Sequence, residues 1–397
     1  MIDLARRIKQ VKPSATLSIT AKAASLRAQG KNIISLSVGE PDFDTPEHAR
    51  QAAIEAINKG KTRYTAVAGI PELRKAISSK LKQDNGLDYE PANILVSSGG
   101  KQCIYNLMQA ILNPNDEVII PAPFWVSYPD MALLAEGRPV IVQATSDADF
   151  KLTPEQLAAV INQSTRLLVL NSPSNPTGMA YSAEDFAALG EVLKEHSRVT
   201  VMSDEMYEKI LFDRKPFASF AAANPELFER TITVGGVSKA YCMTGWRIGY
   251  AAGPAHIIKA MDMVQSQSTS NPCSVSQHAA LAAMTGPQDD LQEMVRTYQQ
   301  RRDWLVSRLN QIPGFECLTP DGAFYVFPGV QALLDRLSFK DDIELCDWLL
   351  DEAGVALVPG TAFGAPAYVR FSYAVSQDTL AEACTRIEQA IGRRTSA

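Results

Sequence analysis

Short runs of aliphatic and β-branched residues alternate with helical stretches through the middle of the chain, and this alternation limits the possible folds more than any other feature. The expected strands are Ile94–Ser97, Glu117–Ile120, Pro139–Gln143, Arg166–Asn171, Thr200–Asp204, Thr231–Val234 and Gly249–Ala252. Helices are expected between many of them, at Gln102–Leu112, Tyr128–Ala135, Ala183–His196 and Ala255–Val264. Strands separated by helices favour an α/β fold with a mostly parallel sheet. Continuous apolar runs such as Leu167–Leu170 are typical of strands that helices cover on both faces.

The pattern changes from about Leu291 onward. A long helix is expected there, followed by a Gly/Pro-marked β region, a helix, a strand and a final helix, at Leu291–Gln311, Cys317–Phe327, Ile343–Glu352, Ala356–Val358 and Leu380–Ile391. A chain of 397 residues is long for one simple core. We therefore predict a large α/β domain at 46–288 and a smaller α+β domain built from 1–45 and 289–397.

The overall composition argues against several classes of protein. The net charge of -6 and the absence of basic blocks give no reason to expect a nucleic-acid or membrane partner. The N-terminal residues lack the apolar stretch of a signal peptide, and no apolar run is long enough for a bilayer. The six cysteines and four histidines are scattered without metal-ligand spacing. We expect a cytoplasmic protein with reduced thiols and no metal site.

The segment from Val237 to Arg247 carries the most specific chemistry. It reads Val-Ser-Lys-Ala-Tyr-Cys-Met-Thr-Gly-Trp-Arg. A lysine that forms a Schiff base has to lose its proton readily, and Lys239 has the hydroxyl of Ser238 beside it. Arg247 can make a two-pronged contact with a phosphate. A lone lysine would be interpreted as a surface charge, so the prediction depends on the whole segment.

Other polar and glycine positions have an ordinary interpretation as well as a functional one. Gly39 in Val38–Phe43 allows a close backbone approach. Ser97–Gln102, which contains Gly100, leads from a strand into a helix start, where backbone N–H groups bind phosphate well. Both sequences also suit plain turns. Asp204 ends an apolar strand, where ligands of open α/β sheets gather, but it could equally cap a helix.

Taken together, these motifs resemble the fold-type-I pyridoxal-phosphate aminotransferases of class I/II, whose lysine signature has the form Ser-Lys-x-x-x-Met-Thr-Gly-Trp-Arg-x-Gly. The resemblance covers almost the whole chain and implies the fold of that family, with a mostly parallel seven-stranded sheet in the large domain. It implies that Lys239 is the catalytic residue and binds the cofactor. The other cofactor-binding residues that it implies are Gly100, Lys101, Gln102, Trp125, Asn175, Asp204, Tyr207, Ser238, Arg247 and, from a neighbouring subunit, Tyr64. For the substrate it implies Gly39, Trp125, Asn175 and Arg370, with Arg370 holding the α-carboxylate.

Within the family, the chain is most similar to the bacterial aspartate aminotransferases. The resemblance implies a homodimer with shared active sites, which moves an amino group from aspartate or glutamate to 2-oxoglutarate or oxaloacetate by a ping-pong mechanism. Lys101 and Thr16 would bind the distal carboxylate, although a simple phosphate contact by Lys101 is an equal alternative. Aminotransferases for aromatic amino acids, prephenate or alanine are the competing functions on the same scaffold.

Two positions depart from patterns seen in relatives. Some aspartate aminotransferases bind the distal carboxylate with an arginine from the partner, but the corresponding stretch Gln265–Asn271 contains no arginine. Gly236 stands where some relatives have a phosphate-binding serine, so Ser238 would have to supply that hydroxyl.

Overall fold

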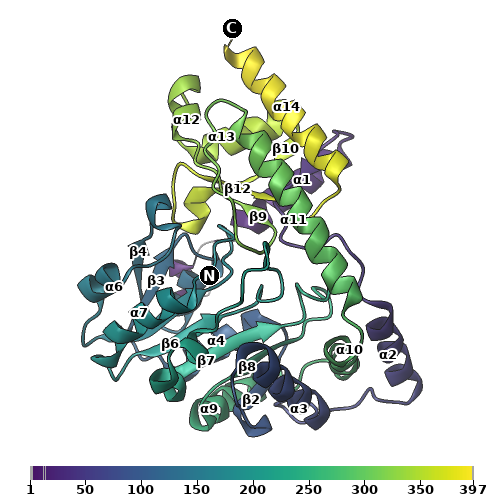
Figure 1. Ribbon diagram of the computed structural model, residues 1–397, viewed down its shortest axis with the longest axis vertical. Helices are drawn as coiled ribbons and strands as arrows, with labels where there is room; N and C mark the ends of the chain where they lie inside the picture. Colours follow the sequence, from purple (N-terminus) through teal and green to yellow (C-terminus); the bar gives the residue numbers. More distant parts are fainter. Residues whose placement is uncertain (1–2, 12, 14, 396–397) are drawn as a thin grey trace.

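The computed structural model describes residues 3–11, 13 and 15–395, except for the side chains of residues 15–17. Its main feature is a seven-stranded sheet with the order β2-β8-β7-β6-β5-β3-β4 (Figure 1). The strands are β2 (Ile94–Ser97), β3 (Glu117–Ala122), β4 (Arg138–Gln143), β5 (Thr165–Asn171), β6 (Thr200–Asp204), β7 (Thr231–Gly236) and β8 (Gly249–Ala252). Strand β8 runs antiparallel to the other six strands of this sheet, which all point the same way. The predicted seven strands and the mostly parallel sheet are confirmed.

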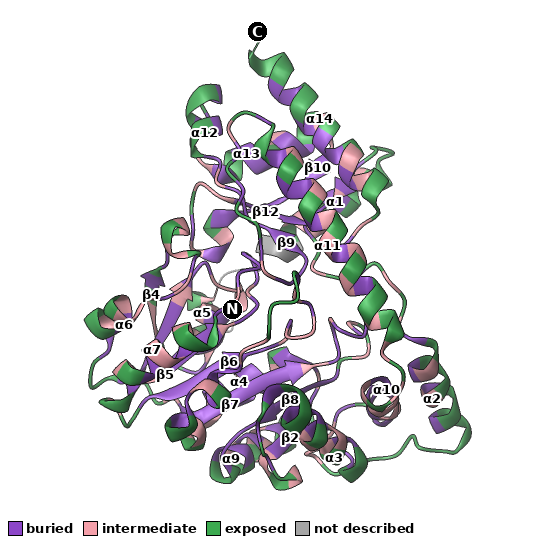
Figure 2. Ribbon diagram, in the orientation of Figure 1, coloured by how far each residue is buried: buried purple, intermediate pink, exposed green. Residues whose placement is uncertain are grey.

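Alternate residues of the central strands pack on opposite faces of the sheet, as the twofold period of a strand requires. Leu167 and Val169 of β5 pack with helices α4 (Gly100–Ile111), α5 (Ser127–Leu134) and α9 (Ala255–Ser266). Leu168 and Leu170 pack on the other face with α6 (Pro154–Val160), α7 (Ala183–Lys194) and α8 (Phe220–Ala223). Figure 2 shows the central strands buried and the helices exposed on their outer sides. The apolar run therefore reflects a sheet covered on both faces.

Further helices complete the part of the molecule that holds the sheet. They are α2 (Glu47–Asn58), α3 (Pro71–Lys80) and α10 (Ser274–Thr285), and α3 continues into a π-helical turn at Leu81–Asn85. These helices pack with β2 and β8 in one apolar cluster. Strand β4 lies at the edge of the sheet and contains Pro139, which cannot donate a ladder hydrogen bond.

The order and direction of the strands bring several chain segments to one edge of the sheet. The parallel strands β3, β4, β5, β6 and β7 end at the same edge. Strand β2 ends there too, because it is antiparallel to β8, and β8 is antiparallel to β7. Strand β8 begins at this edge for the same reason. Loops that follow six strands and the segment before the seventh therefore lie along one edge, where open α/β sheets bind ligands.

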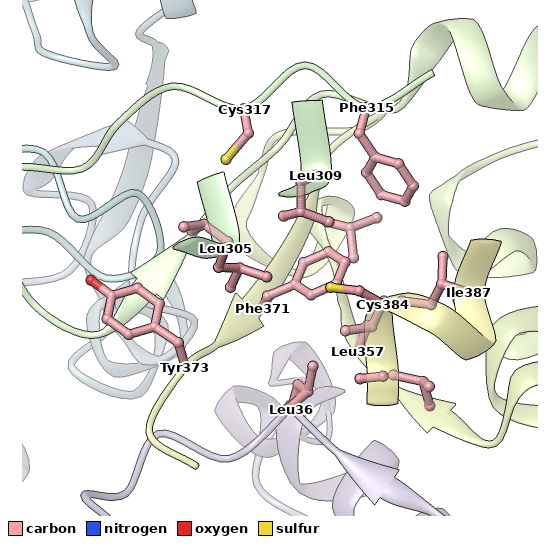
Figure 3. Close-up of a cluster of buried hydrophobic side chains, with 14 of the residues drawn as sticks. Leu36, Leu305, Leu309, Phe315, Cys317, Leu357, Phe371, Tyr373, Cys384 and Ile387 are labelled. Atoms are coloured by element: carbon pink, nitrogen blue, oxygen red, sulfur yellow. The ribbon is translucent and has the colours of Figure 1, made fainter. Parts of the chain in front are cut away.

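The C-terminal part of the chain forms a second assembly, joined to the first by the long helix α11 (Asp289–Asn310) (Figure 1). Its elements are β9 (Tyr325–Val326), α12 (Gln331–Leu337), α13 (Asp342–Trp348), β10 (Val355–Ala356), β11 (Val358–Pro359), β12 (Val369–Ser372) and α14 (Gln377–Thr395). The N-terminal segment contributes α1 (Ala15–Ala28) and β1 (Ile34–Ser35), and β1 pairs in parallel with β10. Figure 3 shows Leu36 packed among side chains of the C-terminal part. The division of the chain at residues 45/46 and 288/289 stays a prediction.

Two expected elements of the C-terminal part differ in the structure. The single strand expected at Ala356–Val358 is two short strands, because the chain changes partner at Leu357, from β1 to β12. The helix expected at Ile343–Glu352 is α13 followed by a π-helical turn at Leu349–Ala353. In the part of the chain that the structure describes, no helix is long and apolar enough to cross a bilayer.

The buried cluster of Figure 3 gives a first testable prediction. Leu305→Ala should lower the free energy of unfolding by about 2–5 kcal/mol, because it leaves a cavity among fully buried neighbours such as Leu309 and Phe371. Urea unfolding followed by circular dichroism at fixed protein concentration measures this change. Leu318→Ala, at a side chain that is 39% exposed, should change it by no more than about 0.5 kcal/mol. Equal effects of the two variants would contradict the described core.

Candidate active site

A cavity of about 300 Å³ lies at the edge of the sheet where the strand ends meet. This volume is at the lower end of the range for small-molecule sites. Eleven residues singled out from the sequence line it: Gly39, Gly100, Lys101, Trp125, Asn175, Asp204, Tyr207, Ser238, Lys239, Arg247 and Arg370. They come from loops after strands of the sheet, from the N-terminal segment and from β12. The fold therefore gathers in one cavity residues that are more than three hundred positions apart.

Two other predicted site residues, Gln102 and Tyr64, do not line this cavity. The side chain of Gln102 accepts a hydrogen bond from the Ser98 N–H at 2.6 Å and donates to Thr269. Tyr64 is 92% exposed on the surface of the chain. The side chain of Thr16 lies outside the described residues. Gln102 thus holds the loop before α4, and an isolated chain gives Tyr64 no contact with its own cavity.

Lys239 lies in the wall of the cavity, three residues after the end of β7. Its Nζ donates a hydrogen bond of 2.6 Å to the carbonyl oxygen of Gly39. The surrounding protein keeps water from the ammonium and lowers the pKa of Lys239 to about 8, an effect that the carboxylate of Glu40 opposes. An amine with such a pKa is deprotonated more readily than an exposed lysine, so Lys239 is suited to act as a nucleophile or base.

Asp204 is the last residue of β6, and its carboxyl group is buried. Burial raises the pKa of Asp204 to about 6, while a hydrogen bond from the hydroxyl of Tyr128 opposes this rise. The loop after β6 also brings Tyr207 to the cavity, where its hydroxyl lies 2.8 Å from that of Tyr325. A carboxylate in this position can pair with a cationic group of a bound ligand.

Arg370 projects from β12 and is almost completely buried. It donates from Nη1 to Oδ1 of Asn175 at 2.9 Å and from Nη2 to the carbonyl oxygen of Ser37 at 2.6 Å. Its Nε has no hydrogen-bond partner, although it is buried. The rings of Tyr325 and Phe363 flank the guanidinium at 4.5 and 5.0 Å. A buried, unpaired N–H is costly, so this site favours an anionic ligand.

A second arginine lies beside the N-terminus of α4. Arg247 donates to the carbonyl oxygens of Thr244, at 2.9 Å, and Ser98, at 3.4 Å. It packs so closely on Gly99 that a Cβ atom at this glycine would collide with the guanidinium. Gly99 also has a φ of 89°, which a residue with a side chain rarely adopts. A guanidinium next to free N–H groups of a helix start is well suited to bind a phosphate.

Lys101 and Trp125 form the remaining wall of the cavity. The Nζ of Lys101 lies 4.9 Å from the centre of the Trp125 ring. Burial lowers the pKa of Lys101, and the positive charge of Arg247 lowers it further. Two cations near one another are stabilised when an anion binds between them, which makes this wall a further candidate for anion recognition.

Sequence reasoning missed several residues that line or shape the cavity. Tyr325 contacts Gly39 closely, since a Cβ atom at Gly39 would collide with the Tyr325 hydroxyl. Asn171 accepts from the Asn175 N–H at 2.9 Å and donates to the Asp204 carbonyl at 3.0 Å. A polar residue that ends an apolar strand was the available signal for Asn171, while Tyr325 lay in a region expected only to be β-structure. Among residues 3–11, 13 and 15–395, no cluster of histidine, cysteine and acidic side chains could hold a metal ion.

Known sequences match this chain over almost its whole length. The sequence profile described as "Aminotransferase class I and II" matches residues 31–387. An aspartate/prephenate aminotransferase of Cereibacter sphaeroides is 53% identical over 393 residues, which cover 98% of each chain. An aspartate aminotransferase of Rhizobium meliloti is 50% identical over 394 residues, covering 98% of this chain and 96% of the relative.

Solved structures agree with these sequences. The crystal structure of an aspartate aminotransferase from Rhizobium meliloti superimposes with a TM-score of 0.95 at 48% identity, covering 99% of this chain and 100% of the other. An aspartate aminotransferase of Thermus thermophilus, determined with maleate, gives a TM-score of 0.93 at 43% identity, covering 98% and 100%. Since the family profile, the relatives and the fold agree from end to end, the chain belongs to the class I and II aminotransferases.

Proposed function

We propose that this protein is a pyridoxal-phosphate-dependent aminotransferase that transfers the amino group of aspartate or glutamate to 2-oxoglutarate or oxaloacetate by a ping-pong mechanism. The observation that carries the proposal is the placement of Lys239, whose pKa is lowered to about 8, in one cavity with Asp204 and Arg370. Names of relatives at about half identity over nearly the full chain support aspartate as the donor.

The residues of the cavity fit pyridoxal phosphate. Arg247, Ser238 and the N-terminus of α4 at Gly100 form a cationic and N–H-rich end that suits the phosphate. Asp204 offers a carboxylate for the ring nitrogen. In the proposed arrangement Asn175 and Tyr207 hydrogen-bond the phenolic oxygen, and Trp125 packs on the ring. Gln102 would act at the phosphate through its contact with the loop before α4, and a phosphate contact is one of the two roles open to Lys101.

When bound, pyridoxal phosphate supplies an electron sink that stabilises the negative charge left on the substrate Cα after loss of its proton. The Nζ of Lys239 acts as the base that removes this proton and as the acid that returns one. Because the pKa of Lys239 is lowered to about 8, its neutral and its cationic form are both available near neutral pH. Asp204 is buried, and in the low dielectric of the protein interior its carboxylate forms a stronger ion pair with a cationic ring nitrogen than it would in water.

Recognition of the substrate rests on Arg370 and Lys101. The unpaired Nε of Arg370 and the backbone at Gly39 would bind the α-carboxylate, and Lys101 is the proposed partner of the distal carboxylate, with Thr16 as a second candidate. A solved relative from Thermus thermophilus was determined with the dicarboxylate maleate, which supports a dicarboxylic substrate here.

Prephenate is the second candidate substrate. Relatives from Cereibacter sphaeroides and Nitrosomonas europaea, 53% and 50% identical, carry the name aspartate/prephenate aminotransferase. Prephenate carries a second carboxylate in addition to that of its 2-oxo acid group, just as aspartate and glutamate carry one in addition to the α-carboxylate. The same Lys101 could therefore serve both substrates, and turnover of prephenate with aspartate as donor distinguishes a dual from a single specificity.

We further propose a cytoplasmic homodimer. The 92% exposure of Tyr64 supports a role in the site of the neighbouring subunit, since it is free to reach a partner. Exposed apolar side chains on α2, Ile54 and Ile57, add a surface that a partner could cover. The six cysteines are all free, which suits a reducing compartment. The part built from 1–45 and 289–397 is the proposed small domain that closes on the substrate.

The Lys239→Ala variant tests the central assignment. Purified wild-type protein loaded with pyridoxal phosphate should show a visible absorption band that aspartate and glutamate bleach faster than alanine or phenylalanine. Lys239→Ala should lower kcat by about 10²–10⁴-fold or more, because the base and acid of the reaction are lost. Undiminished turnover of Lys239→Ala, or no visible band after soaking with the cofactor, would overturn the proposal.

Lys101→Met separates the two roles open to this lysine. If Lys101 binds the distal carboxylate, KM for aspartate should rise about 10–100-fold, because a charged hydrogen bond of about 1.5–3 kcal/mol is lost. The KM for alanine, which has no distal carboxylate, is the control and should change little. Equal losses for both donors together with weaker cofactor binding would assign Lys101 to the phosphate instead.

Mixed dimers test the shared active site. Tyr64→Ala should weaken cofactor binding, and Lys239→Ala should abolish turnover, so each homodimer has low activity at limiting cofactor. A dimer with one chain of each variant should recover activity, since one of its sites then contains a native Lys239 and a native Tyr64 from the other chain. Absence of any recovery after subunit exchange would place Tyr64 in its own chain's site or outside the site.

A further inference from the structure

The buried hydroxyl of Tyr128 makes a contact with Asp204 to which the family assignment gives no role. Tyr128 is 1% exposed and donates a hydrogen bond of 2.6 Å to Oδ2 of Asp204. The other oxygen, Oδ1, accepts from the backbone N–H of Met206 at 3.1 Å. Among the residues that the structure describes, no lysine or arginine forms a salt bridge with this carboxylate. The Tyr128 hydroxyl is thus the only side-chain donor described for Asp204.

Packing alone does not explain why position 128 is a tyrosine, because the ring would fill the same space without its hydroxyl. Tyr128 belongs to the apolar cluster formed by α4, α5 and one face of the sheet, where a phenylalanine ring would fit equally well. Burying a hydroxyl without a partner is unfavourable, so the partner is what makes a tyrosine acceptable there. The 2.6 Å distance falls in the range for hydrogen bonds from a hydroxyl to a charged carboxylate.

Local structure links this contact to the cavity. Tyr128 lies in the first turn of α5, and its backbone N–H donates to the carbonyl oxygen of Trp125 at 3.0 Å. The two rings meet edge to face at 5.3 Å. The same turn of chain therefore fixes the position of Trp125, in the wall of the cavity, relative to Tyr128, the donor to Asp204.

We propose that Tyr128 is a positioning residue, whose permanently protonated hydroxyl keeps Asp204 ionised and oriented toward the cavity for the cofactor's ring nitrogen. The role in holding a cofactor rests on the proposed function, whereas the Tyr128–Asp204 hydrogen bond is independent of it. Burial and the neighbouring Asp204 charge raise the pKa of Tyr128 well above its ordinary value, so the hydroxyl stays protonated and can donate between pH 5 and 7.

The other titratable groups that face Asp204 keep their charge across a useful pH window. Burial raises the pKa of Cys103 to about 12, and burial raises that of Tyr207 well above its ordinary value, so both stay neutral. Lys239, with a pKa of about 8, stays mostly cationic up to pH 7. Between pH 5 and 7 Asp204 is therefore the group in this set that changes charge, with a pKa of about 6.

The sign of the pH effect follows from the direction of this shift. Burial holds the pKa of folded Asp204 above its unfolded value, so ionising it costs stability, and the cost grows as the pH rises toward about 6 and then levels off. Without the Tyr128 hydroxyl the folded pKa should be higher still. The cost then keeps growing beyond pH 6, and the stability gap between variant and wild type widens.

The test compares Tyr128→Phe with Tyr181→Phe in the full-length, cofactor-free protein. Tyr181 is a matched control, because it is also buried, its hydroxyl accepts the Leu152 N–H at 2.7 Å, and it does not line the cavity. Thermal unfolding at pH 5 and pH 7 should show a gap to wild type that widens by about 1–3 °C for Tyr128→Phe. The gap for Tyr181→Phe should be the same at both pH values.

An Asp204→Asn background completes the comparison, since an amide does not ionise. There the loss caused by Tyr128→Phe should no longer depend on pH. In the loaded enzyme, Tyr128→Phe should lower kcat by about tenfold, as for one pKa unit, with KM for aspartate changed less than twofold. A pH-independent gap in the wild-type background would make Tyr128 a packing residue only and overturn the proposal.

A measurement on the unmutated tyrosine guards against a variant that fails to fold. In protein labelled with ¹³C at tyrosine Cζ, one of the 12 tyrosine signals should shift with a midpoint near pH 6 and should stop shifting in Asp204→Asn. No such signal would also overturn the proposal. Apart from the kcat of the loaded enzyme, none of these readouts involves turnover. Failure of the aminotransferase assignment would therefore show in the Lys239→Ala experiment and leave the unfolding and ¹³C results intact.

Discussion

The active-site cavity depends on the burial of three ionisable groups, Lys239, Asp204 and Arg370, away from bulk water. Burial opposes the charge of each, raising the pKa of Asp204 and lowering those of Lys239 and Arg370. The chain compensates only in part, with a hydroxyl for Asp204, a carbonyl oxygen for Lys239, and two acceptors for Arg370. An apoprotein that leaves such groups incompletely paired gains most from a ligand that supplies the missing charges. The incomplete pairing of these three groups lowers the stability of the protein, and it also gives the cavity its affinity for a charged ligand and its reactive lysine.

Two parts of the chain have to meet for these groups to share one cavity. The sheet delivers Asp204 and Lys239 from neighbouring parallel strands, whereas Arg370 arrives on β12 from the C-terminal part. The N-terminal segment joins the two parts, because Leu36 packs in the C-terminal core and Ser37 and Gly39 offer carbonyl oxygens to Arg370 and Lys239. A movement of the C-terminal part would therefore carry Arg370 and this segment together relative to the sheet.

How far the sequence could predict this arrangement depended on the kind of signal. Six of the seven strands were predictable because their residues are buried on both faces of the sheet, and the seventh, β4, is a partly exposed edge strand that tolerates Pro139. The two-residue strands of the C-terminal part were not, since β10 and β11 exist only through partners distant in sequence. The cavity was predictable where motifs were long, as around Lys239, but a side chain such as Gln102 could turn to the backbone without leaving any trace in the sequence.

Tyr128 shows why other contacts of the site could not be predicted from the sequence. Its sequence neighbours drew attention to Trp125, and at the start of a helix with apolar neighbours a tyrosine suggests only packing. Its significance depends on which face of β6 Asp204 points to, a fact that exists only once the sheet and α5 are assembled. Polar contacts between distant elements have no periodicity and no fixed spacing, so they are read from the fold. Such contacts are also where one family can adjust a shared cofactor site, since the hydroxyl acts on Asp204 without contacting a substrate.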